Sequence, residues 1–134
     1  MKPVLSKSRF LAGLQCPLRL WYQCYNRKLA TLAPPTLQAI FDMGHEVGRL
    51  ATKLYPAGLY VSEDYMHHPE AQKTTESAIA NPNVPAIFEG AFVFDDIRIR
   101  VDILERLSND RWKMIEVKSS TSAKEIYIVD AAVQ

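Results

Sequence analysis

The chain has 134 residues, of which 48% are hydrophobic and 23% charged, and its formal net charge is +1. This composition is typical of one globular domain with its own core, and it excludes a membrane protein because no apolar run is long enough to cross a bilayer. A nearly neutral chain can bind nucleic acid only through local basic patches. The two cysteines, Cys16 and Cys24, form neither a disulfide framework nor a complete metal site, so we expect a reducing, cytoplasmic compartment.

Residues 1–28 are predicted to form a pair of short basic helices. Ser6 is a suitable N-cap for the first helix, and Pro17 suits the first turn of the second. The basic side chains of this pair include Lys7, Arg9 and Arg19. Two interpretations of this cluster stay open: a face that is simply solvated, or a surface that contacts a nucleic-acid backbone.

The next predicted helix covers residues 36–54 and carries His45 on the flank of its apolar face. That face has helical spacing and is expected to be buried: Leu37, Ile40, Gly44, Val47, Ala51 and Leu54. A glycine in a helix interior costs roughly 1 kcal/mol relative to alanine, so Gly44 and Gly48 predict a close approach of this helix to a sheet. That approach would bring His45 over the acidic side chains of the strands that follow.

Two smaller elements are expected before those strands. Residues 58–61 can form a short edge strand, and residues 69–80 a helix that begins with a proline. His67 and His68 precede this helix. Adjacent side chains point in different directions, so we expect both histidines at the surface rather than as ligands.

Residues 86–118 are predicted to form a three-stranded antiparallel sheet. Its strands are the runs 87–94, 97–104 and 112–118, separated by Asp95-Asp96 and by Ser108-Asn109-Asp110. If these turns have two and three residues, Glu89 lies opposite Asp102, and Asp102 lies opposite Glu116. Opposed side chains share a face and stand about 5 Å apart. Lys118, two residues after Glu116, points to that same face.

A row of opposed carboxylates destabilises a sheet unless something binds it. One interpretation is a charged face in water; the other is a divalent cation, since Mg²⁺ and Mn²⁺ prefer oxygen ligands. We favour the cation, because Glu89 would share its face with the apolar residues Ile87, Ala91 and Val93.

Residues 122–134 are predicted to form a C-terminal helix with Ile126, Val129 and Val133 inward. Ser122 and Glu125 have the spacing of a capping box, although the β-branched content keeps a strand open as the alternative. The helix would stop at Gln134 without a C-cap. We therefore expect a chain that is cut, or one that relies on a partner, such as a second copy, to complete its sheet.

Several segments resemble the PD-(D/E)XK nuclease superfamily, and more narrowly its RecB-like branch. Residues 101–104, which contain Asp102, resemble the strand with the first metal-binding aspartate, and residues 115–118 resemble the (D/E)-x-K strand. Residues 41–45 resemble the helix whose histidine reaches the metal. Gln134 lies where the branch has the glutamine of its Gln-x-x-x-Tyr motif. The opening segment, residues 5–17, resembles bacterial proteins of this branch that carry an uncharacterised nuclease-like domain.

The resemblance implies a mixed α/β (α+β) fold with a restriction-endonuclease-like core, of which the C-terminal part is missing. It implies a cation, Mg²⁺ or Mn²⁺, held by His45, Asp102, Glu116 and the carbonyl of Val117. Iron–sulfur nucleases of CRISPR adaptation, which are relatives, use a cysteine placed like Cys16 together with three more near the end of the domain. This chain has no such trio, so an iron–sulfur cluster is not expected in it as it stands.

The leading hypothesis is metal-dependent hydrolysis of a phosphodiester in nucleic acid, with DNA favoured over RNA by the resemblance alone. Asp102, Glu116, Lys118, Glu89 and Gln134 are the candidate catalytic residues, and Lys7, Arg9 and Arg19 are the candidate contacts to nucleic acid. The alternative is a catalytically inactive module with a nuclease fold that binds nucleic acid or a protein partner.

Overall fold

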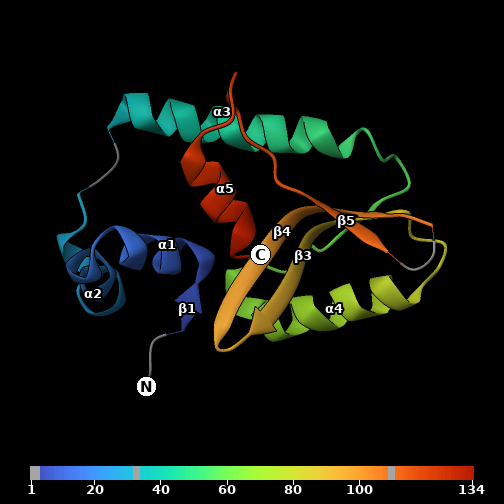
Figure 1. The fold of residues 1–134 in the computed structure, drawn as a ribbon, viewed down its shortest axis with the longest axis horizontal. Coiled ribbons are helices and arrows are strands. Elements are labelled where there is room, and N and C mark those ends of the chain that lie inside the picture. The colour runs from blue at the N-terminus through green and yellow to red at the C-terminus, as the bar shows by residue number, and fades with distance from the viewer. Residues whose placement is uncertain (1–3, 32–33, 109–110) are drawn as a thin grey trace.

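A computed structural model describes residues 4–31, 34–108 and 111–134. The elements, in chain order, are β1 (Leu5–Ser6), α1 (Lys7–Gln15), α2 (Pro17–Tyr25), the 3-10 helix η1 (Arg27–Leu29), α3 (Pro35–Thr52), β2 (Leu59–Tyr60), the 3-10 helix η2 (Tyr65–His67), α4 (His68–Ala80), β3 (Ala86–Phe94), β4 (Ile97–Arg106), β5 (Trp112–Ile115) and α5 (Glu125–Ala132). The predicted mixed α/β class is confirmed: a mixed, curled sheet is flanked by helices (Figure 1).

The centre of the sheet is the hairpin β3–β4. Asp95 and Asp96 both have positive φ, 49° and 62°, which gives the two-residue turn that suits the twist of a hairpin. Phe94 therefore pairs with Ile97, as predicted. On the other edge of β4, Ile103 pairs with Ile115 in the antiparallel strand β5. The Leu107 N–H donates to the Arg111 carbonyl at 2.8 Å, so the predicted pairing continues up to the loop, of which residues 109–110 lie outside the described residues.

Two short parallel strands extend this meander into a five-stranded sheet of order β1-β4-β3-β2, with β5 also on β4. β2 is the predicted edge strand, and it pairs with β3. β1 was not predicted, since two residues carry no periodic signal. Because β4 is ten residues long, β1 pairs with its beginning at Ile97 and Arg98, while β5 pairs with its end.

Each face of the sheet has its own apolar cluster. On one face, α4 packs against β3, with Ala71 and Ala78 beside Ile87, Val101 and Leu104. On the other face, Ala86, Phe88 and Ile103 are covered in part by Ala51 and Tyr55, from the end of α3 and the turn after it. Figure 1 shows α3 and α4 on opposite sides of the sheet. Among the described residues, no helix is both long and apolar enough to cross a membrane.

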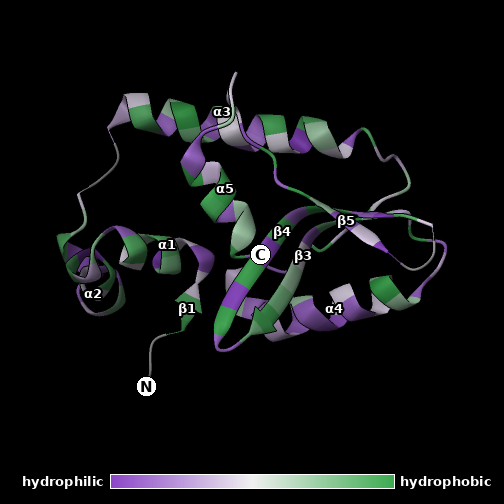
Figure 2. Ribbon diagram, viewed as in Figure 1, coloured by the Kyte–Doolittle hydropathy of each residue, from purple (hydrophilic) through white to green (hydrophobic). Residues whose placement is uncertain are grey.

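The helical boundaries were largely predictable, but the burial of the helices was not. The Ser6 side chain caps α1, where it accepts from the Arg9 N–H, and Pro17 begins α2, both as predicted. The predicted buried face of α3 is wrong: Leu37 is 38% exposed and Ile40 57%. Figure 2 shows hydrophobic positions along α2 and α3 as well as in the strands.

The C-terminal segment is a helix rather than a strand, but its predicted details are wrong. α5 begins at Glu125 after Lys124, which makes no side-chain cap hydrogen bond, so Ser122 and Glu125 form no capping box. Ile126 and Val129, expected to point inward, are 56% and 39% exposed. The one buried residue of α5 is polar, Asp130. The helix is therefore held by charge as much as by apolar packing.

Candidate functional site

The topology of the sheet explains why the two ends of the chain meet. β1 runs parallel to β4 from one end, and β5 runs antiparallel to it from the other end, along the same edge. The two strands point toward each other and end before they meet. The residues that follow each strand therefore lie close together beside the middle of β4. Lys7 follows β1 and Glu116 follows β5, and the Lys7 Nζ lies 3.2 Å from the Glu116 Oε1.

Glu89 and Asp102 occupy a break in the β3–β4 ladder. Phe88 pairs with Ile103 and Gly90 pairs with Val101, so the register places Glu89 opposite Asp102, but these two residues do not form a ladder pair. Glu89 has a φ of 56°, in the left-handed region that residues other than glycine seldom adopt. Its position opposite Asp102 was predicted, whereas the break in the pairing was not.

Both carboxylates line one cleft of about 520 Å³ between α3 and the sheet. The cleft is formed by Gly44, His45, Gly48, Arg49 and Thr52 of α3, by Tyr60, and by Phe88, Glu89, Asp102, Ile103 and Val117. Neighbouring residues of a regular strand point to opposite faces of the sheet. In this cleft, however, Phe88 and its neighbour Glu89 both line the wall, and so do Asp102 and Ile103. The break in the ladder therefore adds two carboxylates to a face where Phe88 and Ile103 are buried.

Neither carboxylate of this pair is neutralised by an ion pair among the described residues. The Asp102 Oδ2 accepts the Val117 backbone N–H at 2.6 Å. Burial raises the pKa of Glu89, and the charge of Asp102 raises it further. Burial also raises the pKa of Asp102, against the Val117 hydrogen bond, and Glu116 adds to the rise. The cleft therefore holds two carboxylates that no described ion pair neutralises, although the charges of Lys7 and Arg100 oppose part of the rise in the Glu89 pKa.

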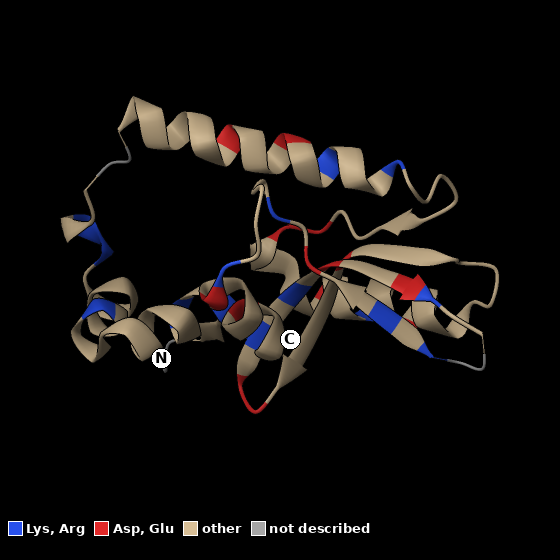
Figure 3. Ribbon diagram, turned by 45° about the horizontal axis from the view of Figure 1, so that its top comes forward, with Lys and Arg blue, Asp and Glu red and all other residues tan. Residues whose placement is uncertain are grey.

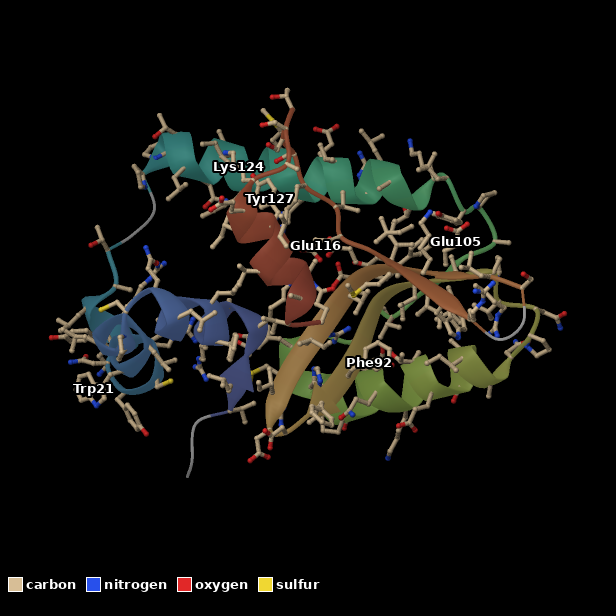
Figure 4. All side chains as sticks on the ribbon, viewed as in Figure 1. Trp21, Phe92, Glu105, Glu116, Lys124 and Tyr127 are labelled. Atoms are coloured by element: carbon tan, nitrogen blue, oxygen red, sulfur yellow. The ribbon has the colours of Figure 1, made fainter. Side chains whose placement is uncertain are left out.

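Glu116 belongs to a second, compensated cluster. It accepts from the Nζ of Lys118 at 2.5 Å, from the Nζ of Lys7 at 3.2 Å and from the Nε2 of Gln134 at 2.6 Å. Asp130 completes the cluster, with Lys118 at 2.5 Å and Lys7 at 3.2 Å. Figure 3 shows charged residues where the segment after β5 meets α5, and Figure 4 places Glu116 beside that helix.

The charges of this cluster hold one another in the ionised state. Burial lowers the pKa of Lys118, but its hydrogen bonds to Asp130 and Glu116 outweigh that effect and raise the pKa to about 12. Burial raises the pKa of Asp130, and the bond from Lys118 with its other partners lowers it below the usual range. Lys118 is therefore an ammonium at neutral pH, able to donate a hydrogen bond but not to accept a proton.

The predicted row of three acids is thus wrong in one respect. Glu89 and Asp102 share the cleft, while Glu116 turns toward Lys7 and Lys118. Two features explain the difference. β5 ends at Ile115, so Glu116 lies outside the strand, and the Val117 N–H donates to the Asp102 side chain rather than to a backbone carbonyl of β4. Within the described residues, no group of three or more His, Cys, Asp or Glu side chains is arranged to hold a metal ion. The cation remains a prediction.

The helix α3 brings His45 to the cleft, as expected, but its glycines do not touch the sheet. A Cβ built on Gly48 would meet nothing within 4 Å, and one on Gly44 only the Ser119 Oγ at 3.8 Å. The predicted close approach of α3 is therefore wrong. Since both glycines line the cleft, their missing side chains leave it open.

The N-terminal candidates lie in different surroundings. Lys7, with its side chain 20% exposed, is engaged with Glu116 and Asp130 rather than free on the surface. Arg9 donates to the Val4 carbonyl at 2.6 Å, and Arg19 bonds to Gln15. Cys16 is exposed, and both it and Cys24 are free thiols.

Three polar residues of structural weight were missed or misjudged from the sequence. Asp130 was assigned no role, although its place one turn before Gln134 on the predicted helix could have indicated one. Arg100 looked like one charge of an alternating strand, yet its guanidinium bonds to the Glu89 carbonyl at 2.8 Å. His68 was expected at the surface, but it is 3% exposed and its Nε2 lies 3.1 Å from the Phe92 carbonyl oxygen.

Comparison of the chain with protein-family models gives no match, and comparisons with curated proteins and with solved structures give none either. The functional argument therefore rests on the residues and their geometry.

Proposed function

We propose that the protein is a metal-dependent nuclease of the PD-(D/E)XK type, of the RecB-like branch with a restriction-endonuclease-like core, that hydrolyses phosphodiester bonds in nucleic acid, DNA rather than RNA. The observation that carries this proposal is the pair Glu89–Asp102, which no described ion pair neutralises, in a cleft that His45 also lines. Half-buried carboxylates that no ion pair neutralises are a suitable donor set for Mg²⁺ or Mn²⁺.

In this proposal Asp102, Glu89, His45 and the Val117 carbonyl would hold the cation, and Glu116 would join them by exchanging its lysine partners. A cation bound there would polarise the phosphate and lower the pKa of the attacking water. The chain's own contribution is the Lys118 ammonium, which donates to the water or to the phosphate oxygen as negative charge develops. The Nε2 of Gln134 keeps Glu116 oriented.

The basic N-terminal pair offers the proposed contact to the nucleic-acid backbone. Arg9 and Arg19 remain available through their charge, whereas Lys7 would contribute only if it exchanged its present partners for phosphate. Two free thiols agree with the reducing compartment we propose, the cytoplasm. A second copy of the chain remains a proposed partner for the sheet.

A second candidate function is a binding module without catalysis. It is favoured by the compensated cluster around Glu116, whose carboxylate already accepts hydrogen bonds from Lys7, Lys118 and Gln134. Such a module would keep the nuclease fold and bind nucleic acid or a protein partner.

Calorimetry with Mn²⁺ and a cleavage assay on labelled DNA and RNA separate the two. The test variant is Asp102→Asn, which removes the charge but keeps an oxygen to accept the Val117 N–H. The matched control is Glu105→Gln, on the same strand but paired with Lys113 at 3.3 Å. Loss of both binding and cleavage in Asp102→Asn alone supports the nuclease. Binding without cleavage in the wild type supports the module, and a wild type that binds no metal overturns the metal site.

A further inference from the structure

Glu89 is held in a conformation that its residue type does not favour. Its φ of 56° lies in the left-handed region, inside a strand whose other described pairs are regular. With regular alternation, its side chain would point with Ile87 and Ala91, which belong to the apolar cluster packed under α4. Burying a carboxylate there without a partner is far less favourable than one strained residue. The left-handed backbone thus directs the carboxylate to the cleft.

Because Glu89 and Asp102 do not form a ladder pair, the Glu89 carbonyl needs another donor, and Arg100 supplies it. The Arg100 Nη1 donates to the Glu89 carbonyl at 2.8 Å. Its Nη2 donates to the Glu63 carbonyl at 2.5 Å and to that of Asp64 at 3.2 Å. Within the described chain, all three of these bonds go to backbone oxygens, so the guanidinium fixes backbone geometry rather than pairing with a carboxylate.

The segment at Glu63 and Asp64, to which Arg100 also donates, is itself anchored. The Glu63 side chain accepts from the Thr74 hydroxyl of α4, and the Val61 N–H donates to the Phe88 carbonyl at 3.0 Å. Arg100 therefore ties Glu89 to a segment held on both the sheet and α4. A lysine keeps the charge but cannot reproduce a planar fork that reaches two sites at once.

We propose that Arg100 is a positioning residue of the cleft: its guanidinium holds the Glu89 carbonyl and so keeps the Glu89 carboxylate beside Asp102. The role in metal binding rests on the proposed function, whereas the positioning of Glu89 does not.

The first test uses the metal-free protein. The backbone three-bond coupling of Glu89, which reports its φ, should show the left-handed conformation in the wild type. In Arg100→Lys this φ should become extended, while the control Arg98→Lys, one of the same strand's other arginines, should keep it positive. A φ that stays positive in Arg100→Lys overturns the proposal. An extended φ in the wild type would also overturn it, and that check needs no variant.

The second test is a double-mutant cycle on Mn²⁺ affinity, measured by calorimetry. Arg100→Lys should weaken binding about tenfold in the wild type and have no further effect in a Glu89→Gln background, because it acts through Glu89. Additive losses would assign Arg100 a role independent of Glu89 and refute the inference. If the wild type binds no Mn²⁺, the proposed function fails, and the NMR measurement of the Glu89 φ still decides the role of Arg100.

Discussion

Removing the charge of Glu89 should make the metal-free protein more stable at neutral pH. Glu89 and Asp102 lie opposite each other on neighbouring strands, and within the described residues neither forms an ion pair with a basic side chain. At the spacing of directly opposed side chains in a regular ladder, about 5 Å, two unit charges would repel by about 3 kcal/mol at an effective dielectric constant of 20. Partial exposure to water and the charges of Lys7 and Arg100 reduce this value. We expect Glu89→Gln to stabilise the protein by about 1 kcal/mol, or roughly 4 °C in Tm for a chain of this size.

The sign of the pH dependence follows from the raised pKa values. A carboxyl whose pKa is raised in the folded state favours folding most below its unfolded pKa, and that contribution is lost as the pH rises through the folded pKa. At a pH below the ordinary carboxyl pKa values both carboxyls are protonated in the folded and the unfolded chain, so Glu89→Gln should change stability little there. The gain should appear only as the pH rises toward neutrality.

The assay is a set of thermal melts with chelator at about pH 3 and at pH 7, repeated at pH 7 with excess Mn²⁺. Mn²⁺ should stabilise the wild type more than the variant, since a ligand stabilises in proportion to its preference for the folded state. The control Glu105→Gln loses the pairing with Lys113 and should not gain stability. If Glu89→Gln is destabilised both with chelator and with Mn²⁺, Glu89 is a satisfied structural acid and the reasoning is wrong.

Three further predictions use the same methods. His45→Ala should weaken Mn²⁺ more than Mg²⁺ in calorimetry, because imidazole is a softer ligand than carboxylate; equal affinities before and after would make the histidine structural. Gly48→Ala should raise the free energy of unfolding by about 1 kcal/mol in urea melts, because alanine favours a helix and the added Cβ meets nothing within 4 Å. A lower free energy of unfolding would instead mean that α3 packs against the sheet at Gly48. Asp130→Asn should cost about 1 to 2 kcal/mol at pH 7 by weakening the bond to Lys118. The pKa of Asp130 is lowered, so this loss should vanish as the pH falls through it; a loss that persists in acid would point to packing instead.

The strand pairing could be predicted because two local features fix it. Asp95-Asp96 sets the hairpin, and the alternation of charged and apolar residues after Ile97 sets the face. Every described β3–β4 pair follows from these, and the β4–β5 pairs follow from the three-residue loop that the sequence predicts at 108–110. The position of Glu89 opposite Asp102 followed from the same counting, and that is why half of the candidate site was predictable.

The rest of the site depends on information that residue types do not carry. Nothing in a glutamate indicates a positive φ, and an arginine in an alternating strand does not show that it binds backbone carbonyls. Helical periodicity defined an apolar face on α3, but periodicity cannot say whether anything covers that face. The pairing of Glu116 with Lys7 required β1, whose two residues are too few for any pattern.

The charge balance of the site links its two clusters. Four carboxylates (Glu89, Asp102, Glu116 and Asp130) face three basic groups (Lys7, Lys118 and Arg100), so one negative charge remains when all are ionised. Arg49, at the cleft, lies 3.8 Å from Glu46 and so does not alter this balance. A divalent cation would displace any protons from the two cleft carboxyls and reverse the balance to one positive charge. That sign would attract a phosphodiester, whereas the metal-free site would repel it. If the proposed function holds, binding of nucleic acid in the cleft should therefore depend on the cation even before any bond is cleaved.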